Sequence, residues 1–516
     1  MRLMKNNQSN KKNQKKNSKN NIKGLFGPFL KGESMEIKDR SSVIFGNPID
    51  QKTIKKANKS KQKFIKKYGD DTNKEYHLAT EQIPSLDFIN TKNLVLSDKP
   101  MEFPKNAMVV GNIRMGFGHY RISIAIASCA KALGYEPYWF DLASFDATGS
   151  KMIRYQNDLY SKASRISQKS KLFNKLFWEP LNSEGFRQIT YNAPDQKNAE
   201  LLAPLYNDLP KDIPFVATHV WPSQGAIHAG LTHVVNAIPD NWPMALHLSE
   251  GAIHCVQTPF AYIGYKMLNG MAKKPLKGIP ENEIFEVGHY VDHELVANIE
   301  QDVANRVKRI ENGEPIRILM SVGGAGAGAK YFLQIIEHLL PLVKEKKVAL
   351  FLNLGDHLDM FEYLKKHIKG FDNEVIKYFD EYAKLNEFVN EMDKKVVEGT
   401  YIFYHKNIFE AVYSTNLLMR HVEMLITKPS ELAFYPVLKV MMRHIGGHEI
   451  YGAIHAQELG DSTFECPDKK SMNEMLDRLI NDKELLIHLN KQIIKLKEQG
   501  VYNGGYKAVK LAVKGK

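Results

Sequence analysis

The chain has 516 residues, enough for two or three domains of ordinary size. Its 43% hydrophobic and 25% charged residues are a typical globular mixture, and no stretch approaches the roughly 18 apolar residues that span a bilayer. We therefore expect a protein that is not integral to a membrane. Cys129, Cys255 and Cys466 lie far apart and form no CxxC pair, which favours a reducing, cytoplasmic environment over a disulfide framework.

The net charge of +13 is concentrated at the N-terminus. Residues 1–31 hold nine Lys or Arg residues and no acid, which leaves a net charge of only +4 for the rest of the chain. Because lysines alternate there with Asn, Gln and Ser, the segment buries too little apolar surface to fold, and we predict a disordered tail. Attraction to anionic lipid headgroups or to RNA is the alternative, and no specific nucleic-acid partner is expected. Residues 32–104 are predicted to be an extension with some local structure.

The pattern of a doubly wound sheet begins at Ala107. A short apolar run, 108–110, is followed by a glycine-containing loop and then by apolar residues at helical spacing up to Gly134, which we expect to end the helix. Further strands are predicted at 138–140, 215–217, 244–246 and 253–256. This succession predicts a Rossmann-like domain over residues 105–290.

A second unit of the same kind follows a charged segment, 291–315, that we interpret as a linker. Strands are predicted at 316–322, 348–352, 401–404, 424–426 and 440–442, and a second glycine loop follows the first of them. We predict a second Rossmann-like domain over 316–470 and helices over 471–516. The fold class is thus α/β, with two Rossmann-like domains facing each other across a cleft, where ligands bind in such folds.

Three segments of the second domain suit a nucleotide diphosphate. Glycines in the loop after the first strand let backbone N–H groups approach a phosphate, although a tight packing turn explains them too. After the strand 424–426, Lys428 suits a diphosphate and Glu431 a ribose diol, whereas Ser430 and Glu431 also fit a simple helix cap. After the strand 440–442, Arg443 and a flexible run face the same cleft, with a surface salt bridge as the alternative for Arg443. The candidate donor-binding residues are Gly323, Gly324, Gly326, Lys428, Ser430, Glu431, Arg443, Gly446, Gly447, His448 and Glu449.

Candidate acid–base residues gather at predicted strand ends of the first domain. His119 stands at the start of a helix, where the helix dipole lowers the pKa of an imidazole and leaves a neutral base near pH 7. Asp240 is a second candidate base. Each residue alone is more often structural, but several converge on one cleft. The candidate acceptor-binding residues are Gly116, Gly118, His219 and His247.

The order of these motifs resembles glycosyltransferase family 28, which includes the monogalactosyldiacylglycerol synthases and the N-acetylglucosaminyltransferase that makes lipid II. The motifs are Gly118-His119, Thr218-His219, Pro239-Asp240, Gly288-His289, the glycine loop at 323–326, Thr427-Lys428 with Glu431, and 446–449, so the resemblance covers about residues 105–465. It implies a GT-B fold, a UDP-sugar or other nucleotide-sugar donor in the second domain and an acceptor held by the first.

The resemblance also implies roles for particular residues. His119 matches a loop histidine that acts as base or contacts the acceptor, Glu431 the carboxylate that holds the donor ribose, and the glycine loop the diphosphate site. His448 stands where the family has a sugar-binding Gln. The Lys428–Glu431 loop is several residues shorter than the family pattern, and Gly452 stands nearest to a family Asn.

These features together predict a metal-independent, inverting glycosyl transfer with no cofactor, in which the acceptor remains unidentified and a lipid is one candidate. Basic and aromatic residues over 160–191 favour an interfacial helix and contact with an anionic membrane, at the inner face of the cell membrane; a core helix with a charged outer face is the alternative. A nucleotide-sugar epimerase on the same fold, or a sugar- or lipid-binding protein without turnover, are the rival functions.

Overall fold

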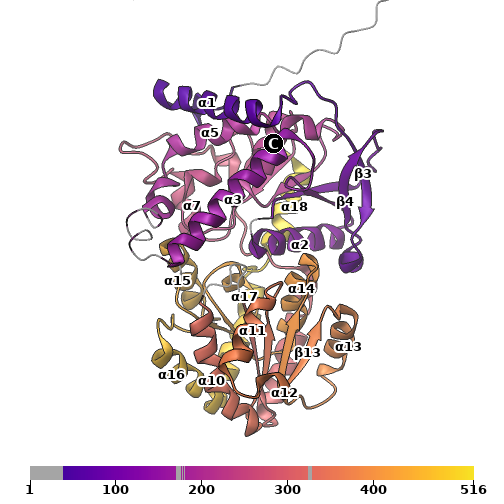
Figure 1. Ribbon diagram of the computed structural model, residues 1–516, viewed down its shortest axis with the longest axis vertical. Helices are drawn as coiled ribbons and strands as arrows, with labels where there is room; N and C mark the ends of the chain where they lie inside the picture. Colours follow the sequence, from indigo (N-terminus) through magenta and orange to yellow (C-terminus); the bar gives the residue numbers. More distant parts are fainter. Residues whose placement is uncertain are drawn as a thin grey trace, which may run out of the picture. The chain divides into compact units, whose positions relative to one another are not determined.

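The computed structural model describes residues 39–114, 116–169, 172, 176, 178, 180–322, 328–444 and 446–516. The predicted tail at 1–31 and the glycine loop at 323–327 lie outside these residues. All described residues belong to one unit, which contains two open α/β sheets (Figure 1).

The first domain is built on an eight-stranded sheet in the order β10-β9-β8-β7-β5-β6-β4-β3. All neighbours are parallel except β3 and β4, which form an antiparallel pair at one edge. The central strand β5 is buried along its whole length, as expected for a parallel strand covered on both faces. The strands are β3 (His77–Gln82), β4 (Lys92–Ser97), β5 (Ala107–Asn112), β6 (Glu136–Asp141), β7 (Phe215–Ala217), β8 (Val234–Ala237), β9 (Ile253–Val256) and β10 (Ile284–Glu286).

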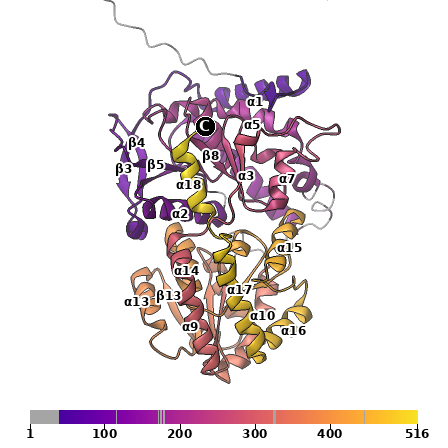
Figure 2. The same ribbon diagram turned by 180° about the vertical axis from the view of Figure 1, so that it is seen from behind.

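Helices cover both faces of this sheet (Figures 1 and 2). Helix α2 is apolar on nearly every side, because it packs against its own sheet, against α14 of the second domain and against the C-terminal helix α18. It ends at the predicted place, where Gly134 has a φ of +89°. The helices of this domain are α1 (Gln51–Tyr68), α2 (Phe117–Ala132), α3 (Thr148–Lys169), α5 (Ile189–Ala199), α6 (Val220–His228) and α7 (Pro259–Lys266), with short turns η1 (Pro84–Ile89), η3 (Leu181–Gly185), η4 (Ala203–Tyr206), η5 (Ala245–His247) and η6 (Glu281–Glu283) and a small hairpin β1 (Val43–Ile44) and β2 (Asn47–Pro48).

The segment predicted as an extension, 32–104, is integral to the first domain where it is described. Strands β3 and β4 complete the sheet, and α1 packs along α5. Helix α1 is hard to recognise from the sequence because only Ala57 and Phe64 are buried and lysines dominate the rest of it.

One predicted strand is wrong. The segment predicted as the strand 244–246 contains no strand; Ala245–His247 form the short turn η5, which packs beneath α5. A short apolar run fits a buried turn as well as a strand, and Pro243 immediately before it removes a backbone N–H that a central strand would need.

The second domain has a six-stranded, fully parallel sheet in the order β13-β14-β12-β11-β15-β16. Its strands are β11 (Ile316–Ser321), β12 (Val348–Asn353), β13 (Val375–Phe379), β14 (Gly399–Tyr404), β15 (Met424–Thr427) and β16 (Lys439–Met441). Its helices and turns are α10 (Ala329–Lys344), α11 (Leu358–His367), α12 (Phe371–Glu374), α13 (Tyr382–Met392), α14 (Ile408–Met419), η7 (Glu431–Phe434), η8 (Gly447–Glu449), α15 (Ile450–Leu459), α16 (Lys469–Asn481) and α17 (Lys483–Glu498).

The connections between the domains are helical. The predicted linker, 291–315, contains α8 (His293–Ala297) and α9 (Ile299–Glu311), and α9 packs on α17. The last helix, α18 (Gly504–Lys514), leaves the second domain and packs on α2, β7 and β8 of the first (Figure 2). The predicted α/β fold with two Rossmann-like domains is therefore confirmed.

Candidate functional site

Both sheets contain a topological switch point, where consecutive connections leave in opposite directions. In the first sheet β5 lies between β6 and β7, and in the second sheet β11 lies between β12 and β15. Open α/β sheets bind ligands in the crevice at the carboxyl ends of such strands. The connections that leave β5, β7 and β15 lead to His119 in the first turn of α2, His219 at the N-cap of α6 and Glu431 at the start of η7, so these sequence candidates lie at the two crevices.

The carboxyl ends of the two sheets face each other. Arg114, which follows β5, forms an ion pair of 2.9 Å with Asp356, which follows β12. A Cβ added at Gly118 would lie 3.2 Å from Glu431 Oε2, so the carboxylate of the second domain rests against the first turn of α2. Gly118 thereby provides the space in which residues of the two domains meet, and Gly116, with a φ of +98°, turns the chain into α2.

His119 is held in a defined tautomer. Its Nδ1 lies 2.7 Å from the carbonyl oxygen of Thr218, and because a carbonyl only accepts, Nδ1 carries the proton and Nε2 keeps a lone pair. Burial lowers the pKa of His119, although the bond to Thr218 and the charge of Asp240 act in the other direction. Burial, rather than the helix dipole on which we based the prediction, is therefore the main cause of the lowered pKa of His119.

His219 has the complementary tautomer. It caps the N-terminus of α6, where its Nδ1 accepts the backbone N–H of Trp221 at 3.2 Å, so its Nε2 bears the proton. Its ring meets that of His119 edge to face, with centroids 4.9 Å apart, and burial lowers its pKa well below the ordinary range. An imidazole acceptor and an imidazole donor therefore lie side by side.

Asp240 and His247 form a pair beside these rings. Asp240 Oδ2 lies 3.0 Å from His247 Nε2, close although not aligned as a hydrogen bond. Burial acts to raise the pKa of Asp240, but His247, His448 and His119 outweigh it and hold that pKa well below its usual range. Asp240 therefore stays ionised, which makes it a weak proton acceptor and a fixed negative charge.

The loop after β15 is organised around an ion pair. Lys428 Nζ lies 2.8 Å from Glu449 Oε1; burial acts to lower the lysine pKa, but Glu449 and Glu431 outweigh it and raise that pKa. Ser430 makes no side-chain capping bond, and Glu431 begins only the four-residue turn η7. The helix that we predicted to start here is therefore wrong, and an ordinary N-cap does not account for Ser430.

The run 446–449 brings a histidine to the boundary between the domains. The His448 ring covers Gly446, where an added Cβ would lie 2.5 Å from Cε1, and His448 lies close enough to Asp240 to help lower the pKa of that carboxyl. His448 Nδ1 is buried and has no partner among the described residues. Gly447 starts η8, and Gly446 N–H donates to Glu449 Oε2 at 3.4 Å.

Arg443 is exposed, and its positive charge acts on Tyr331 in the first turn of α10. Arg443 therefore lies near the start of α10, the helix that follows the glycine loop in the sequence. Gly323, Gly324 and Gly326 themselves lie outside the described residues. The structure thus brings together His119, His219, Asp240, His247, Glu431 and His448, whereas Arg443 lies apart from them.

Sequence reasoning missed an aromatic contact that joins the domains. The Tyr451 ring of α15 packs nearly parallel to Trp242, at 4.6 Å and 14°, and to Phe260, at 4.7 Å and 7°, and the Trp242 and Phe260 rings are themselves 6.2 Å apart. The guanidinium group of Arg187 also lies over the Trp242 ring, 4.3 Å from its centroid. These residues are far apart in sequence, and single aromatic residues in loops carry no signal of stacking. We refer to Trp242, Tyr451 and Phe260 as the aromatic clamp.

Within the described part of the chain, no group of three or more His, Cys, Asp or Glu residues is placed to hold a metal ion. None of the described helices has the length and apolar character to cross a membrane. The three cysteines are buried and unpaired. The described groups can therefore hold a proton on an imidazole, fix negative charge beside it and bind a ligand through Lys428 and Glu431.

Residues 43–267 match a family model described as "Domain of unknown function (DUF6937)", and residues 279–513 match one described as "Domain of unknown function (DUF6938)". No curated protein matches the chain. Solved structures with a similar arrangement include the UDP-GlcNAc 2-epimerase of Neisseria meningitidis bound to UDP-GlcNAc, with 10% identity, 79% of this chain and 98% of that chain covered and a TM-score of 0.41. Another is the S. aureus MnaA–UDP structure, with 11% identity, coverages of 78% and 94% and a TM-score of 0.38.

A glycosyltransferase of Rickettsia africae is similar at 11% identity, with coverages of 79% and 96% and a TM-score of 0.36. With TM-scores this low, the similarities carry no argument about substrate. The family-28 resemblance stays a prediction, and the chain is similar to two adjoining family models that each bear the description of a domain of unknown function.

Proposed function

We propose that this protein is a glycosyltransferase that moves a sugar from a nucleotide-diphosphate sugar to an acceptor hydroxyl. One observation carries the proposal: His119 keeps an unprotonated Nε2 in one domain while Glu431 of the other domain rests against the same turn of α2. A base for the acceptor and a carboxylate suited to a ribose diol thus meet at the boundary of two nucleotide-binding folds.

In the proposed reaction the acceptor oxygen attacks the anomeric carbon and its proton passes to His119 Nε2. The bond between the anomeric carbon and the diphosphate oxygen breaks, and the nucleotide diphosphate leaves with the bonding electrons. Lys428, cationic beside Glu449, is suited to stabilise that charge, as are backbone N–H groups of the glycine loop. Between the two candidate bases, the low pKa of Asp240 favours His119, with Asp240 stabilising the imidazolium that forms.

The test separates donor binding from chemistry. Glu431→Gln removes one charged hydrogen-bond acceptor, so we expect UDP-sugar affinity in titration calorimetry to fall about tenfold to hundredfold, as for a charge-assisted bond. His119→Gln keeps a polar side chain and should preserve affinity while turnover falls about 10²- to 10⁴-fold, the usual contribution of a positioned base. Glu81→Gln, an exposed carboxylate on β3, is the matched control. Unchanged affinity of Glu431→Gln for every nucleotide sugar tested would rule out the donor site.

A nucleotide-sugar epimerase is the second candidate, because the site holds more acid–base groups than one transfer needs. Asp240, His247 and His448 lie beside His119, and a sugar bound among them meets proton donors and acceptors together. The two reactions differ in products. A transferase releases free nucleotide diphosphate only when an acceptor is present, whereas an epimerase changes the sugar of the intact nucleotide sugar without any acceptor.

We further propose that the acceptor is a lipid at an anionic membrane surface. Helix α7 and the residue after it expose Phe260, Ile263 and Met267, which are 44%, 58% and 59% exposed, and the exposed Lys273 and Lys274 follow. Apolar side chains one helical turn apart next to lysines are typical of an interfacial contact.

The surface continues onto α3. Leu159 of α3 is 58% exposed, and Leu172, beyond the end of α3, is 69% exposed. The rings of Tyr160 and Trp178 meet at a tilt of 52° with centroids 5.0 Å apart, and Arg187 donates to the Asn269 carbonyl beyond α7. The double change Ile263→Ser and Met267→Ser should reduce sedimentation with phosphatidylglycerol vesicles. The exposed pair Ile376→Ser and Val396→Ser in the second domain is the control. An equal loss of sedimentation with the vesicles in the two double variants would contradict the membrane proposal.

A further inference from the structure

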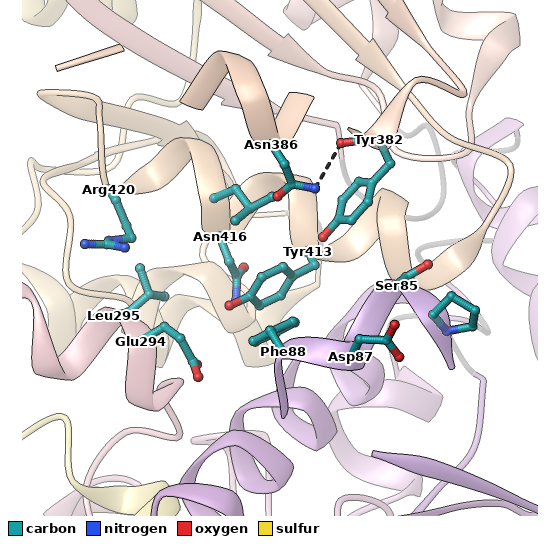
Figure 3. Close-up of a pocket in the computed structure, with 12 residues that line it drawn as sticks. Ser85, Asp87, Phe88, Glu294, Leu295, Tyr382, Asn386, Tyr413, Asn416 and Arg420 are labelled. Atoms are coloured by element: carbon teal, nitrogen blue, oxygen red, sulfur yellow. Dashed lines mark hydrogen bonds between the residues drawn. The ribbon is translucent and has the colours of Figure 1, made fainter. Parts of the chain in front are cut away.

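A cavity of about 330 Å³ lies between the two domains, away from the candidate site. It is bounded by η1 of the first domain, by α8 of the connecting segment and by α13 and α14 of the second domain (Figure 3). None of its lining residues belongs to the acid–base cluster around His119. Its volume is at the lower end of the range of small-molecule sites.

Aromatic rings form one wall of this cavity. Phe88 and Tyr413 are in contact, with ring centroids 4.6 Å apart and the rings tilted by 31°, and Phe88 is 44% exposed while Tyr413 is only 4% exposed. Tyr413 is buried apart from its contact with the cavity, its hydroxyl makes no hydrogen bond to any described residue, and Figure 3 shows the hydroxyl directed toward the side on which Glu294 lies. A hydroxyl that lines a cavity and has no protein partner is available to a ligand there.

The charge of the lining is negative. Asp87 and Glu294 contribute carboxylates, and in Figure 3 they lie on either side of Phe88. The one cation among the lining residues, Arg420, is neutralised by Asp302, whose two oxygens accept from its Nε and Nη2 at 3.0 and 3.1 Å. Ser128 donates to a single oxygen of Glu294, which leaves the other oxygen for a ligand.

Two further acidic groups lie behind the lining. Glu410 accepts a hydrogen bond from Ser85 at 3.0 Å, and Asp292 acts on Tyr413 from the α8 side. Burial raises the pKa of both carboxyls, that of Asp292 to about 7, so Asp292 is only partly ionised near neutral pH and Asp87 and Glu294 carry most of the negative charge. A phosphate or carboxylate ligand would meet these negative charges, whereas a cation would be attracted by them and by the aromatic faces.

We propose that this cavity binds a small aliphatic diamine or polyamine. One amino group donates to Glu294 and the Tyr413 hydroxyl, a second donates to Asp87, and the methylene chain between them covers the Phe88 ring. The ligand contacts both domains, so it stabilises their joined arrangement and strengthens whatever else binds across the boundary. This inference does not depend on the proposed glycosyl transfer.

The test uses the full-length protein with putrescine and spermidine as probes, measured by titration calorimetry and by thermal shift. We expect both to bind, with 1,4-butanediol, of the same length but uncharged, giving no shift. Glu294→Gln keeps the shape and the Ser128 contact but removes the charge, and Asp87→Asn removes the charge of an exposed side chain with little change of shape. Each should weaken putrescine binding about tenfold or more, as expected for losing a charged hydrogen bond.

Two controls make the outcome decisive. Glu81→Gln changes the net charge equally at a distant exposed site and should leave putrescine affinity unchanged. Tyr413→Phe keeps the ring and removes only the hydroxyl, so its affinity should fall less than that of Glu294→Gln. No calorimetric binding of either amine, or equal affinity in Glu294→Gln, Asp87→Asn and the unaltered protein, would overturn the proposal.

Discussion

The aromatic clamp should hold the two domains together, and its removal can be measured. Tyr451 belongs to the second domain, while Trp242 and Phe260 belong to the first, so both ring contacts of the tyrosine cross the domain boundary. Each aromatic pair is worth about 0.5–1.5 kcal/mol beyond its burial. The two pairs together therefore favour the joined arrangement by about 1–3 kcal/mol, or roughly 5- to 150-fold.

The perturbation is Tyr451→Ala, with Tyr451→Phe as the matched control because it keeps the stacking ring. We expect Tyr451→Ala to increase the radius of gyration in small-angle X-ray scattering, as the domains separate more often, and Tyr451→Phe to leave it unchanged. Nucleotide-sugar affinity should decrease in the alanine variant, since ligands at the boundary bind the joined arrangement.

A double-mutant cycle with Phe260→Ala isolates the stacking energy. Phe260 is the better partner for this cycle, because Trp242 also stacks with Arg187 and its removal would disturb that contact. Free energies of unfolding from urea titrations should give a coupling of about 0.5–1.5 kcal/mol between Tyr451 and Phe260. If the two changes add to within about 0.3 kcal/mol, the limit for independent sites, the stacking does not stabilise the boundary and the reasoning is wrong.

Two other predictions concern stability. His254 is fully buried and accepts a hydrogen bond from the Ser249 N–H at 3.1 Å. Burial lowers the pKa of His254 to about 4, whereas its pKa in the unfolded chain is near 6.5. Between these two pH values the unfolded chain binds a proton at His254 that the native protein does not bind. Stability should therefore fall as pH drops from 6.5 toward 4, by roughly 2 kcal/mol at pH 5 from this residue, and a urea titration of His254→Gln should show a correspondingly weaker decline between pH 7 and pH 5; an identical decline would contradict the assignment. Lys439 and Asp461 form a fully buried ion pair of 2.5 Å. Lys439→Met should lower the free energy of unfolding by about 3–5 kcal/mol, because it leaves the carboxylate without its cation, whereas the double variant Lys439→Met with Asp461→Leu should recover most of that loss. Equal destabilisation of the single and double variants would show that packing rather than charge dominates.

The chain's periodicity determined most of the second domain. Strands such as β12 and β14 are continuous apolar runs because both faces of a parallel sheet are covered, and each was predicted close to its observed bounds. The N-terminal segment was harder, because α1 buries only two side chains and β3 lies at a sheet edge, so neither shows a strong apolar pattern.

The candidate site shows the same division. That His119 and Glu431 follow strands could be read from the sequence, because the turn from a strand into the next element is a local property. The tertiary structure alone decided that His119 and Glu431 meet and that His119 adopts this tautomer. It also decided that Asp240 is ionised and that Tyr451 packs against the other rings of the aromatic clamp. Each of these depends on a carbonyl, a charge or a ring contributed by a distant part of the chain, and local residue patterns contain no information about which distant groups will come into contact.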